Sequence, residues 1–330
     1  MRSPPRSLLL PALLLLTIGC ERRAAEPAEA APPAAEVQAA PGERTVPIDS
    51  LFGATAVENL RLIPMEVEVP NLPRGWEGAR LAAFSDFQLG LWEDNEQVAA
   101  AAVQRAVEAG AEVFLLLGGY LAREDQAEAL ARVLAPLRGR SALAVLSSYD
   151  ARSEEMLAQV TRTLDAQGIT ILRNERAALE RGGDTLRIAG LAPNYLYLPD
   201  WRQVMTVDTL GTRTTPILLT PFPELARLIP VNRYSLVLAG RVFCGDVEIP
   251  GTPRLAALAG ETLQGFQVEG VERLYRVRGN PLFITCGTGY TFVPVRLSAP
   301  AEALLITLRG PPQPVQPDTT AAPPSDTLRQ

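Results

Sequence analysis

Short apolar runs alternate with helix-like segments from residue 80 to residue 172, and this order restricts the folds that the chain can adopt. Arg80 to Phe84 is an apolar run that predicts a strand. The segment from about Asn95 to Ala109 places Val98, Ala102 and Ala106 on one helical face before Gly110 ends it. The pattern continues with predicted strands at Val113 to Leu117, Ala142 to Leu146 and Ile169 to Leu172, and with helices near Asp125 to Leu137 and from Ser153 to Gly168. This order predicts an α/β fold.

The pattern becomes richer in strands after Gly183. The strands expected there are Leu186 to Leu191, Ile217 to Thr220, Ser235 to Ala239, Leu274 to Val277, Pro281 to Thr285 and Ala303 to Leu308. With 330 residues, of which 47% are hydrophobic, the chain is long enough to bury a large core. A second, more strand-rich sheet is therefore expected.

The first twenty residues have the features of an export signal. Arg2 and Arg6 precede the apolar run Leu8 to Leu16, which is too short to span a bilayer. The following Thr17-Ile18-Gly19-Cys20 resembles a bacterial lipoprotein box, which implies lipidation of Cys20. Ordinary secretion is the alternative. We expect a lipid anchor to the bacterial cell envelope, with the protein on the periplasmic or extracytoplasmic face.

Two compositionally biased segments flank the predicted domain. Residues 21–56 are rich in Ala, Pro and Glu and predict a tether after a signal peptide at residues 1–20. Residues 310–330 are rich in Pro and Thr and predict a disordered tail. The folded domain should span residues 57–309.

The basic residues exclude several classes of chemistry. The chain has no histidine, and all of its 31 basic residues are arginines. Without an imidazole there is no Ser-His-Asp or Cys-His nucleophile system and no histidine-bound zinc. Without lysine there is no Schiff base. The net charge of −6, with no basic stripe, also argues against nucleic-acid binding.

Polar or glycine-rich loops follow several predicted strands, where ligands collect in open α/β sheets. These loops are Ser85-Asp86-Phe87-Gln88, Gly118-Gly119-Tyr120, Ser147-Ser148-Tyr149-Asp150, Thr220-Pro221-Phe222-Pro223 and Gly240-Arg241-Val242-Phe243. In order and spacing they resemble the calcineurin-like metallophosphoesterases, particularly the bacterial membrane-associated branch. The resemblance implies a four-layer α/β/β/α sandwich of two mostly mixed β-sheets flanked by helices.

The metal ligands of that family have largely been replaced. By the resemblance, Asp86 keeps its position, whereas the other six of seven ligand positions fall on Gln88, Gly119, Ser148, Pro221, Arg241 and Phe243. The position of the catalytic histidine falls on Tyr149. Glycine, proline, arginine and phenylalanine cannot replace the lost ligands through their side chains. We therefore expect no metal, no cofactor and no catalytic residue.

The altered loops leave two questions open. The aromatic residues Phe87, Tyr120, Tyr149, Phe222 and Phe243 either fill the former metal site or line an apolar pocket. Arg241 either pairs with Asp86 or Asp150, or supplies positive charge for an anion. The expected pocket residues are Asp86, Tyr149, Asp150, Arg241 and Phe243.

Three cysteines occur in the chain. If Cys20 carries lipid, Cys244 and Cys286 remain, and an oxidising compartment permits one disulfide between them. Two free buried thiols are the alternative. By the resemblance, both cysteines lie beside the altered loops.

Three hypotheses for function follow. The first is a catalytically inactive metallophosphoesterase-like lipoprotein that acts as a binding or scaffolding domain for an unidentified protein or small molecule. The second is a divergent phosphoesterase in which Asp86, Gln88, Asp150 and Asp246 hold a single Mg or Ca ion. The third is a metal-free enzyme that uses Arg241 with a carboxylate base.

Overall fold

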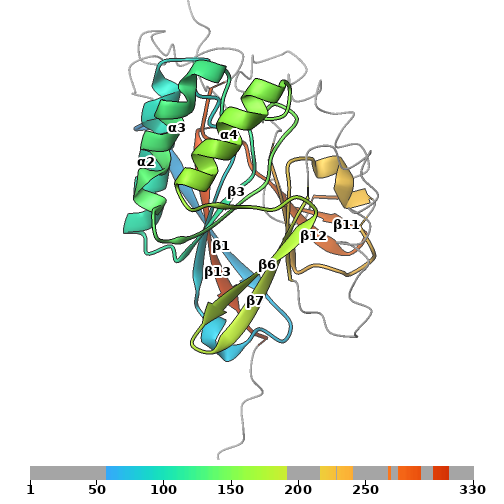
Figure 1. Cartoon of the computed structure of the whole chain (residues 1–330). Coiled ribbons are helices and arrows are strands. Elements are labelled where there is room, and N and C mark those ends of the chain that lie inside the picture. The colour runs from blue at the N-terminus through green and yellow to red at the C-terminus, as the bar shows by residue number, and fades with distance from the viewer. Residues whose placement is uncertain are drawn as a thin grey trace, which may run out of the picture. The chain divides into compact units, whose positions relative to one another are not determined.

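The computed structural model describes residues 57–191, 216–227, 229–240, 267–268, 274–290 and 300–311. All of these belong to one compact unit, Pro47–Gln330. Figure 1 shows two groups of strands packed on each other, with helices α2, α3 and α4 gathered on one side. Among the described residues, no helix has the length and apolar character needed to cross a bilayer.

The first sheet has six strands among the described residues, in the order β1-β13-β2-β3-β4-β5. Strands β2 to β5 are parallel, β13 is antiparallel to β2, and β1 is parallel to β13. Their bounds are β1 Arg61–Glu68, β2 Arg80–Phe84, β3 Val113–Leu116, β4 Ser141–Ala144, β5 Thr170–Ile171 and β13 Glu302–Arg309. Both faces of β2 and β3 are buried, so these strands read as continuous apolar runs.

The second sheet has seven strands among the described residues, in the order β10-β11-β12-β9-β8-β7-β6. Its central strands β12, β9, β8 and β7 are parallel, and antiparallel strands lie at both edges. The bounds are β6 Glu175–Arg181, β7 Asp184–Gly190, β8 Ile217–Thr220, β9 Leu236–Ala239, β10 Gln267–Val268, β11 Leu274–Val277 and β12 Asn280–Ile284. The expected second sheet is therefore present.

Three α-helices and four 3-10 helices occur in the described part of the chain. The α-helices are α2 Asp94–Glu108, α3 Ala127–Leu134 and α4 Glu154–Ala166, and the 3-10 helices are η1 Arg74–Trp76, η2 Glu124–Gln126, η3 Ala135–Leu137 and η4 Pro223–Arg227. Val98, Ala102 and Ala106 of α2 are buried on one face, as expected. The single helix expected near Asp125 to Leu137 is divided into η2, α3 and η3, and Pro136 lies in the last of these.

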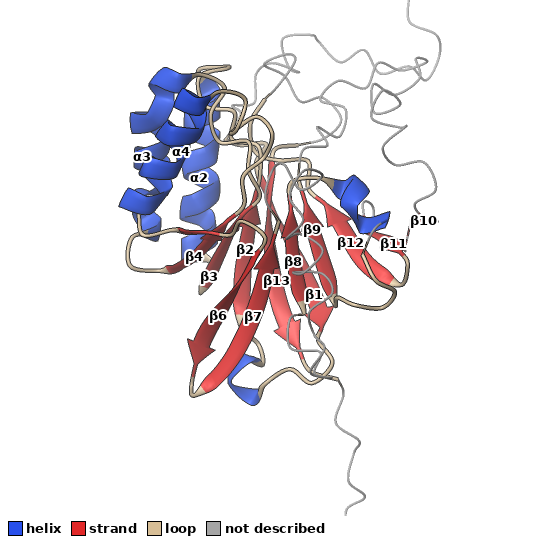
Figure 2. Cartoon of the chain, turned by 45° about the vertical axis from the view of Figure 1, so that its right-hand side comes forward, coloured by secondary structure: helices blue, strands red, loops and turns tan. Residues whose placement is uncertain are grey.

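Buried apolar side chains form three clusters that hold the layers together. One lies between the α-helices and the first sheet, the second lies between the two sheets, and the third covers the outer face of the second sheet. Figure 2 shows α2, α3 and α4 on one side of the strands and a short helix on the other side, near β12. That short helix is η4, whose Leu225 and Ala226 belong to the outer cluster. The α/β architecture with two mixed sheets is confirmed, and η4 represents the fourth layer within the described residues.

Three of the observed strands were not expected from the sequence, namely β1, β6 and the two-residue edge strand β10. Strand β1 contains Pro64 and lies at the edge of the first sheet, where a missing backbone N–H is tolerated. Strand β6 has mainly exposed or half-buried side chains and pairs with β7 along its whole length. Gly182 and Gly183 join β6 to β7, both with positive φ, as a two-residue hairpin turn requires.

Candidate functional site

Asp86 and Gln88 lie at the carboxyl end of β2, in a loop that is held against the loop after β3. The backbone N–H of Asp86 donates to Gly118 O (2.8 Å), and that of Gln88 donates to Gly119 O (2.9 Å). Both residues have positive φ, 54° for Asp86 and 49° for Gln88, which is uncommon for residues other than glycine. Asp86 is 2% exposed and Gln88 is 4% exposed. The loop is therefore a buried and locally strained piece of backbone, of the kind that clusters at functional sites.

Three glycines enclose the side chain of Asp86. A Cβ atom built on Gly119 would lie 2.5 Å from Asp86 Oδ1 and 3.0 Å from Asp86 Cα. A Cβ atom on Gly240 would lie 3.4 Å from Asp86 Oδ2, and one on Gly287 would lie 2.8 Å from Asp86 Cβ. The Asp86 carboxyl group thus occupies space that the side chain of residue 119 would otherwise take.

Asp150 connects the loops after β3 and β4. Its Oδ2 accepts hydrogen bonds from Gly119 N (2.8 Å), Ser147 N (2.7 Å) and Ser147 Oγ (2.7 Å), and its Oδ1 accepts one from Tyr120 N (2.8 Å). Burial raises the pKa of the Asp150 carboxyl, and the hydrogen bonds from Gly119, Ser147 and Tyr120 act in the opposite direction. Because both oxygens bind these loops, Asp150 does not present its carboxyl group to an open pocket.

Two buried polar atoms beside Asp86 have no hydrogen-bond partner among the described residues, namely Ser85 Oγ and Gln88 Nε2. Gln88 Nε2 would lie 3.2 Å from a Cβ atom on Gly119, so it borders the same space as Asp86 Oδ1. An unpaired buried donor destabilises the folded state by about 1–3 kcal/mol. Such atoms are common where a site is built for something other than stability.

Tyr149 is linked to this core, because its backbone N–H donates to Ser147 Oγ (3.2 Å), which itself donates to Asp150 Oδ2 (2.7 Å). Ser148 and Tyr149 are half-buried, and Pro221 is buried in a loop that the Thr220 hydroxyl closes by accepting from Phe222 N (3.1 Å). Arg241, Phe243 and Asp246 lie outside the described residues. The expected pairing of Arg241 with Asp86 or Asp150 therefore stays a prediction.

The described aromatic residues belong to different cores. Phe87 and Tyr120 are each 1% exposed, lie on the helix side of the first sheet and make an edge contact with ring centroids 6.2 Å apart. The Tyr120 hydroxyl donates to Val145 O (2.8 Å), and burial followed by the charge of Asp150 raises its pKa well above the ordinary value. Phe222 lies in the cluster on the outer face of the second sheet. These three side chains therefore do not line a common apolar pocket.

Glu302 and Asn95 hold the last loop in place, and the sequence did not identify these roles. Glu302 is 1% exposed, and its Oε1 accepts a hydrogen bond from Cys286 N (2.8 Å). Asn95 is fully buried, donates to Gln88 O (2.8 Å) and accepts from Tyr290 N (2.7 Å). Glu302 stands among apolar residues in the sequence, which was the available signal, whereas Asn95 lies between Asp94 and Glu96 and offered none.

Cys286 is disulfide-bonded. It precedes Gly287, which packs on Asp86, so the covalent link lies beside the altered site. Its expected partner, Cys244, is outside the described residues, and the pairing stays a prediction.

Comparison with curated proteins links this chain to the metallophosphoesterases. It is 23% identical over 244 residues to the uncharacterized metallophosphoesterase YkuE of Bacillus subtilis (strain 168), and the match covers 72% of this chain and 82% of the relative. The chain is therefore similar to a curated metallophosphoesterase. No family model matches it.

Two solved structures are among those that are similar to this chain. The protein TT1561 of Thermus thermophilus has a TM-score of 0.41 and 15% identity, and the match covers 64% of this chain and 89% of that protein. The phosphopantetheinyl hydrolase PptH from Mycobacterium tuberculosis has a TM-score of 0.36 and 12% identity, and the match covers 75% of this chain and 99% of the hydrolase.

The donor groups near Asp86 do not fit the metal pair that metallophosphoesterases hold. A side chain at position 119, which the resemblance assigns to the bridging carboxylate, would require Asp86 to move, because its Cβ atom would lie 2.5 Å from Asp86 Oδ1 and 3.0 Å from Asp86 Cα. The described residues also contain no group of three or more His, Cys, Asp or Glu side chains arranged to hold an ion. Among the described residues, the Asp86 carboxylate and the Gln88 amide border this space, whereas each of two cations would need several oxygen or nitrogen ligands. No chemical step through a metal pair follows from this arrangement.

Proposed function

We propose that this protein is not a catalyst and acts as a binding or scaffolding domain, anchored to the bacterial cell envelope through a lipid on Cys20. The observation that carries the proposal is the contact between Asp86 and Gly119. The carboxyl group of Asp86 packs where a side chain on residue 119 would lie, and both residues are enclosed by buried backbone. If position 119 corresponds to the bridging ligand of a metal pair, as the resemblance implies, that ligand has lost its side chain and Asp86 occupies its space.

The size of the expected loss supports the proposal. Removing a group that only orients a metal ligand costs about 10- to 100-fold in metal affinity or activity. Six lost direct ligands would therefore cost on the order of a million-fold or more, even without full additivity. A metal pair that clamps the attacking and leaving oxygens cannot function after such a loss.

A single Mg or Ca ion is the weaker proposal. It would require Asp86, Gln88 and Asp150 to turn their oxygens toward one point, with Asp246 as a further ligand. The two oxygens of Asp150 instead accept four hydrogen bonds from Gly119, Ser147 and Tyr120. Releasing them would leave buried N–H donors without acceptors, which is unfavourable.

Hydrolysis of bis(p-nitrophenyl) phosphate, with and without Mn²⁺, tests the proposal. The purified chain should release nitrophenol no faster than the Asp86→Asn variant, because no ligand set remains for Asp86 to complete. Mn²⁺-dependent turnover that disappears in Asp86→Asn would show that the chain is a working phosphoesterase.

A further inference from the structure

A concave region lies at one end of the second sheet, and Asp86 lies at the other end. The concave region is a pocket of about 340 Å³. It is bounded by Pro216 before β8, Ser235 before β9 and Pro281, the second residue of β12. Ser235 and Gly240 are at the two ends of β9, and a strand rises about 3.3 Å per residue. The pocket is therefore roughly 16 Å from the glycine that packs on Asp86.

Asn280 restrains the loops that border this pocket, because it is hydrogen-bonded to the loop before β9. Asn280 is fully buried, and its Oδ1 accepts hydrogen bonds from Arg233 N (2.7 Å) and Tyr234 N (2.8 Å). Its Nδ2 donates to Pro230 O (2.9 Å). The loop before β9 is thus bound to the turn between β11 and β12. Restrained loops lower the entropy lost when a ligand binds.

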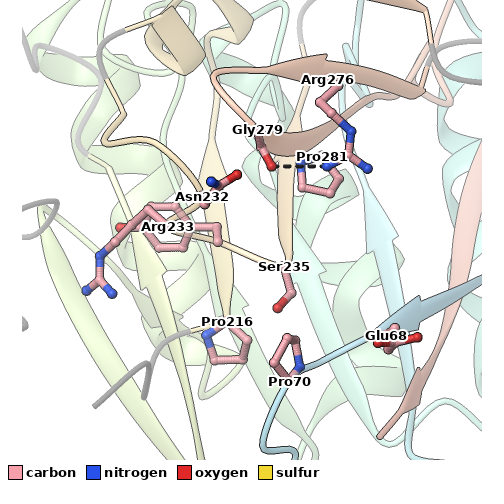
Figure 3. Close-up of a pocket in the computed structure, with 10 residues that line it drawn as sticks. Glu68, Pro70, Pro216, Asn232, Arg233, Ser235, Arg276, Gly279 and Pro281 are labelled. Carbon is pink, nitrogen blue, oxygen red and sulfur yellow. Dashed lines mark hydrogen bonds between the residues drawn. The ribbon is translucent and has the colours of Figure 1, made fainter. Parts of the chain in front are cut away.

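The walls and the polar groups of the pocket differ in chemistry. Figure 3 shows Pro70, Pro216 and Pro281 around the cavity, with Arg276 and Glu68 at its margin. Proline has no backbone N–H, so these walls offer apolar surface and no main-chain donors. Arg276 Nη1 donates to Gly279 O (3.1 Å), which orients the guanidinium group, and a guanidinium has five N–H donors.

We propose that this pocket binds a compact organic anion, with its apolar body against the prolines and its carboxylate or phosphate group on Arg276. The volume is within the range of small-molecule sites. Figure 3 shows the Arg233 guanidinium, whose Cζ atom lies 5.6 Å from the ring centroid of Tyr234, pointing away from Arg276, so Arg276 is the group that would receive the anion. Among the described lining residues, Glu68 is the one acid. A planar fork of donors suits carboxylate and phosphate groups better than neutral ligands. The pocket is separate from the loops around Asp86, so the assignment does not depend on whether those loops are catalytic.

Calorimetric titration of the purified chain with three compounds tests the proposal. Phenyl phosphate and benzoate supply the anion in two forms, and benzyl alcohol supplies the same ring without charge. Both anions should bind, benzyl alcohol should not, and added salt should weaken the binding because the attraction is partly screened. Absence of binding by both anions, or equal binding of benzyl alcohol, would overturn the proposal.

Two variants and a control locate the site. Arg276→Gln should weaken anion binding by about tenfold or more, since a charge-assisted hydrogen bond is lost. Glu68→Gln should keep or improve it, because a nearby negative charge is removed. Arg162→Gln, on the exposed face of α4, should leave it unchanged. Thermal unfolding shows whether each variant is folded. Folded Arg276→Gln with unchanged affinity, or loss of binding in folded Glu68→Gln, would show that an anion does not bind here.

Discussion

At the scale of single residues, Gly119 and Asp86 compete for one space. Gly119 has φ 76°, so any other residue there adopts an unfavourable backbone conformation. A Cβ atom on residue 119 would also lie within 3.0 Å of both Oδ1 and Cα of Asp86. The backbone of Asp86 cannot rotate away as a side chain can, so a larger residue at position 119 would require a shift of that backbone.

Gly119→Ala should therefore lower the free energy of unfolding by about 2–4 kcal/mol, from backbone strain and overpacking together. Gly139→Ala is the matched control, because Gly139 has φ 73° and no heavy atom within 4 Å of the added Cβ. It should cost only about 1 kcal/mol. Urea denaturation measures both. Equal losses in the two variants would mean that Asp86 does not fill the space beside Gly119.

Asp150→Asn should lower the free energy of unfolding by about 1–3 kcal/mol. The amide keeps one acceptor oxygen but turns an NH₂ group toward either Tyr120 N or the donors of Gly119 and Ser147. Asp165→Asn, at an exposed position near the end of α4, is the control and should have little effect. Thermal unfolding of the two variants provides the comparison. A fully stable Asp150→Asn protein would contradict the role of Asp150 as the link between the loops.

The loops around Asp86 could be located from the sequence, because Gln88 and Gly119 closely follow the apolar runs of two strands. That these positions have lost metal ligands stays a prediction. The positive φ angles of Asp86 and Gln88 could not be predicted, since neither residue type requires that conformation. The role of Asp150 was also missed, because a carboxylate that binds backbone N–H groups has no signature in the sequence.

At the scale of elements, strands with a buried face were predicted well and polar edge strands were not. Strand β9 was expected within one residue of its observed bounds, because its apolar run is bounded by loop residues. Strand β6, with the sequence ERAALER, consists mostly of residues that favour helices. Its pairing with β7 through the Gly182-Gly183 turn overrides that local preference.

The start of α4 gives a prediction at this scale. Ser153 was expected to open the helix, and its Oγ accepts a hydrogen bond from Met156 N (3.0 Å). Ser153→Ala should lower the free energy of unfolding by about 1 kcal/mol, since it leaves a backbone donor without this acceptor. Ser153→Thr should retain most of the stability because it keeps the hydroxyl group. Chemical denaturation compares them. No loss in Ser153→Ala would show that the cap is dispensable.

At the scale of the whole molecule, two sheets bring the loops after β2, β3, β9 and β12 together around Asp86. The order of strands and helices predicted this arrangement because parallel strands in α/β folds place their following loops at one edge. Residues 1–56 and 312–330 lie outside the described residues, so the lipid anchor stays a prediction from the sequence.

Cys20→Ser tests that anchor. In a bacterial host the unaltered chain should incorporate labelled palmitate and sediment with membranes, because a lipidated cysteine inserts its acyl chains into the bilayer. Cys20→Ser should lose the label and most of the membrane fraction. Cys286→Ser serves as the control and should keep the label. Unlabelled protein in the membrane fraction, or a labelled Cys20→Ser variant, would contradict lipidation at this position.

The metal content of the chain after dialysis against Mn²⁺ tests the central claim most directly. Elemental analysis should find no manganese above the amount bound by Asp86→Asn, because the space for a bridging ligand beside Asp86 is filled by Asp86 itself. Two manganese ions per chain that are lost in Asp86→Asn would show instead that the loops still assemble a metal pair.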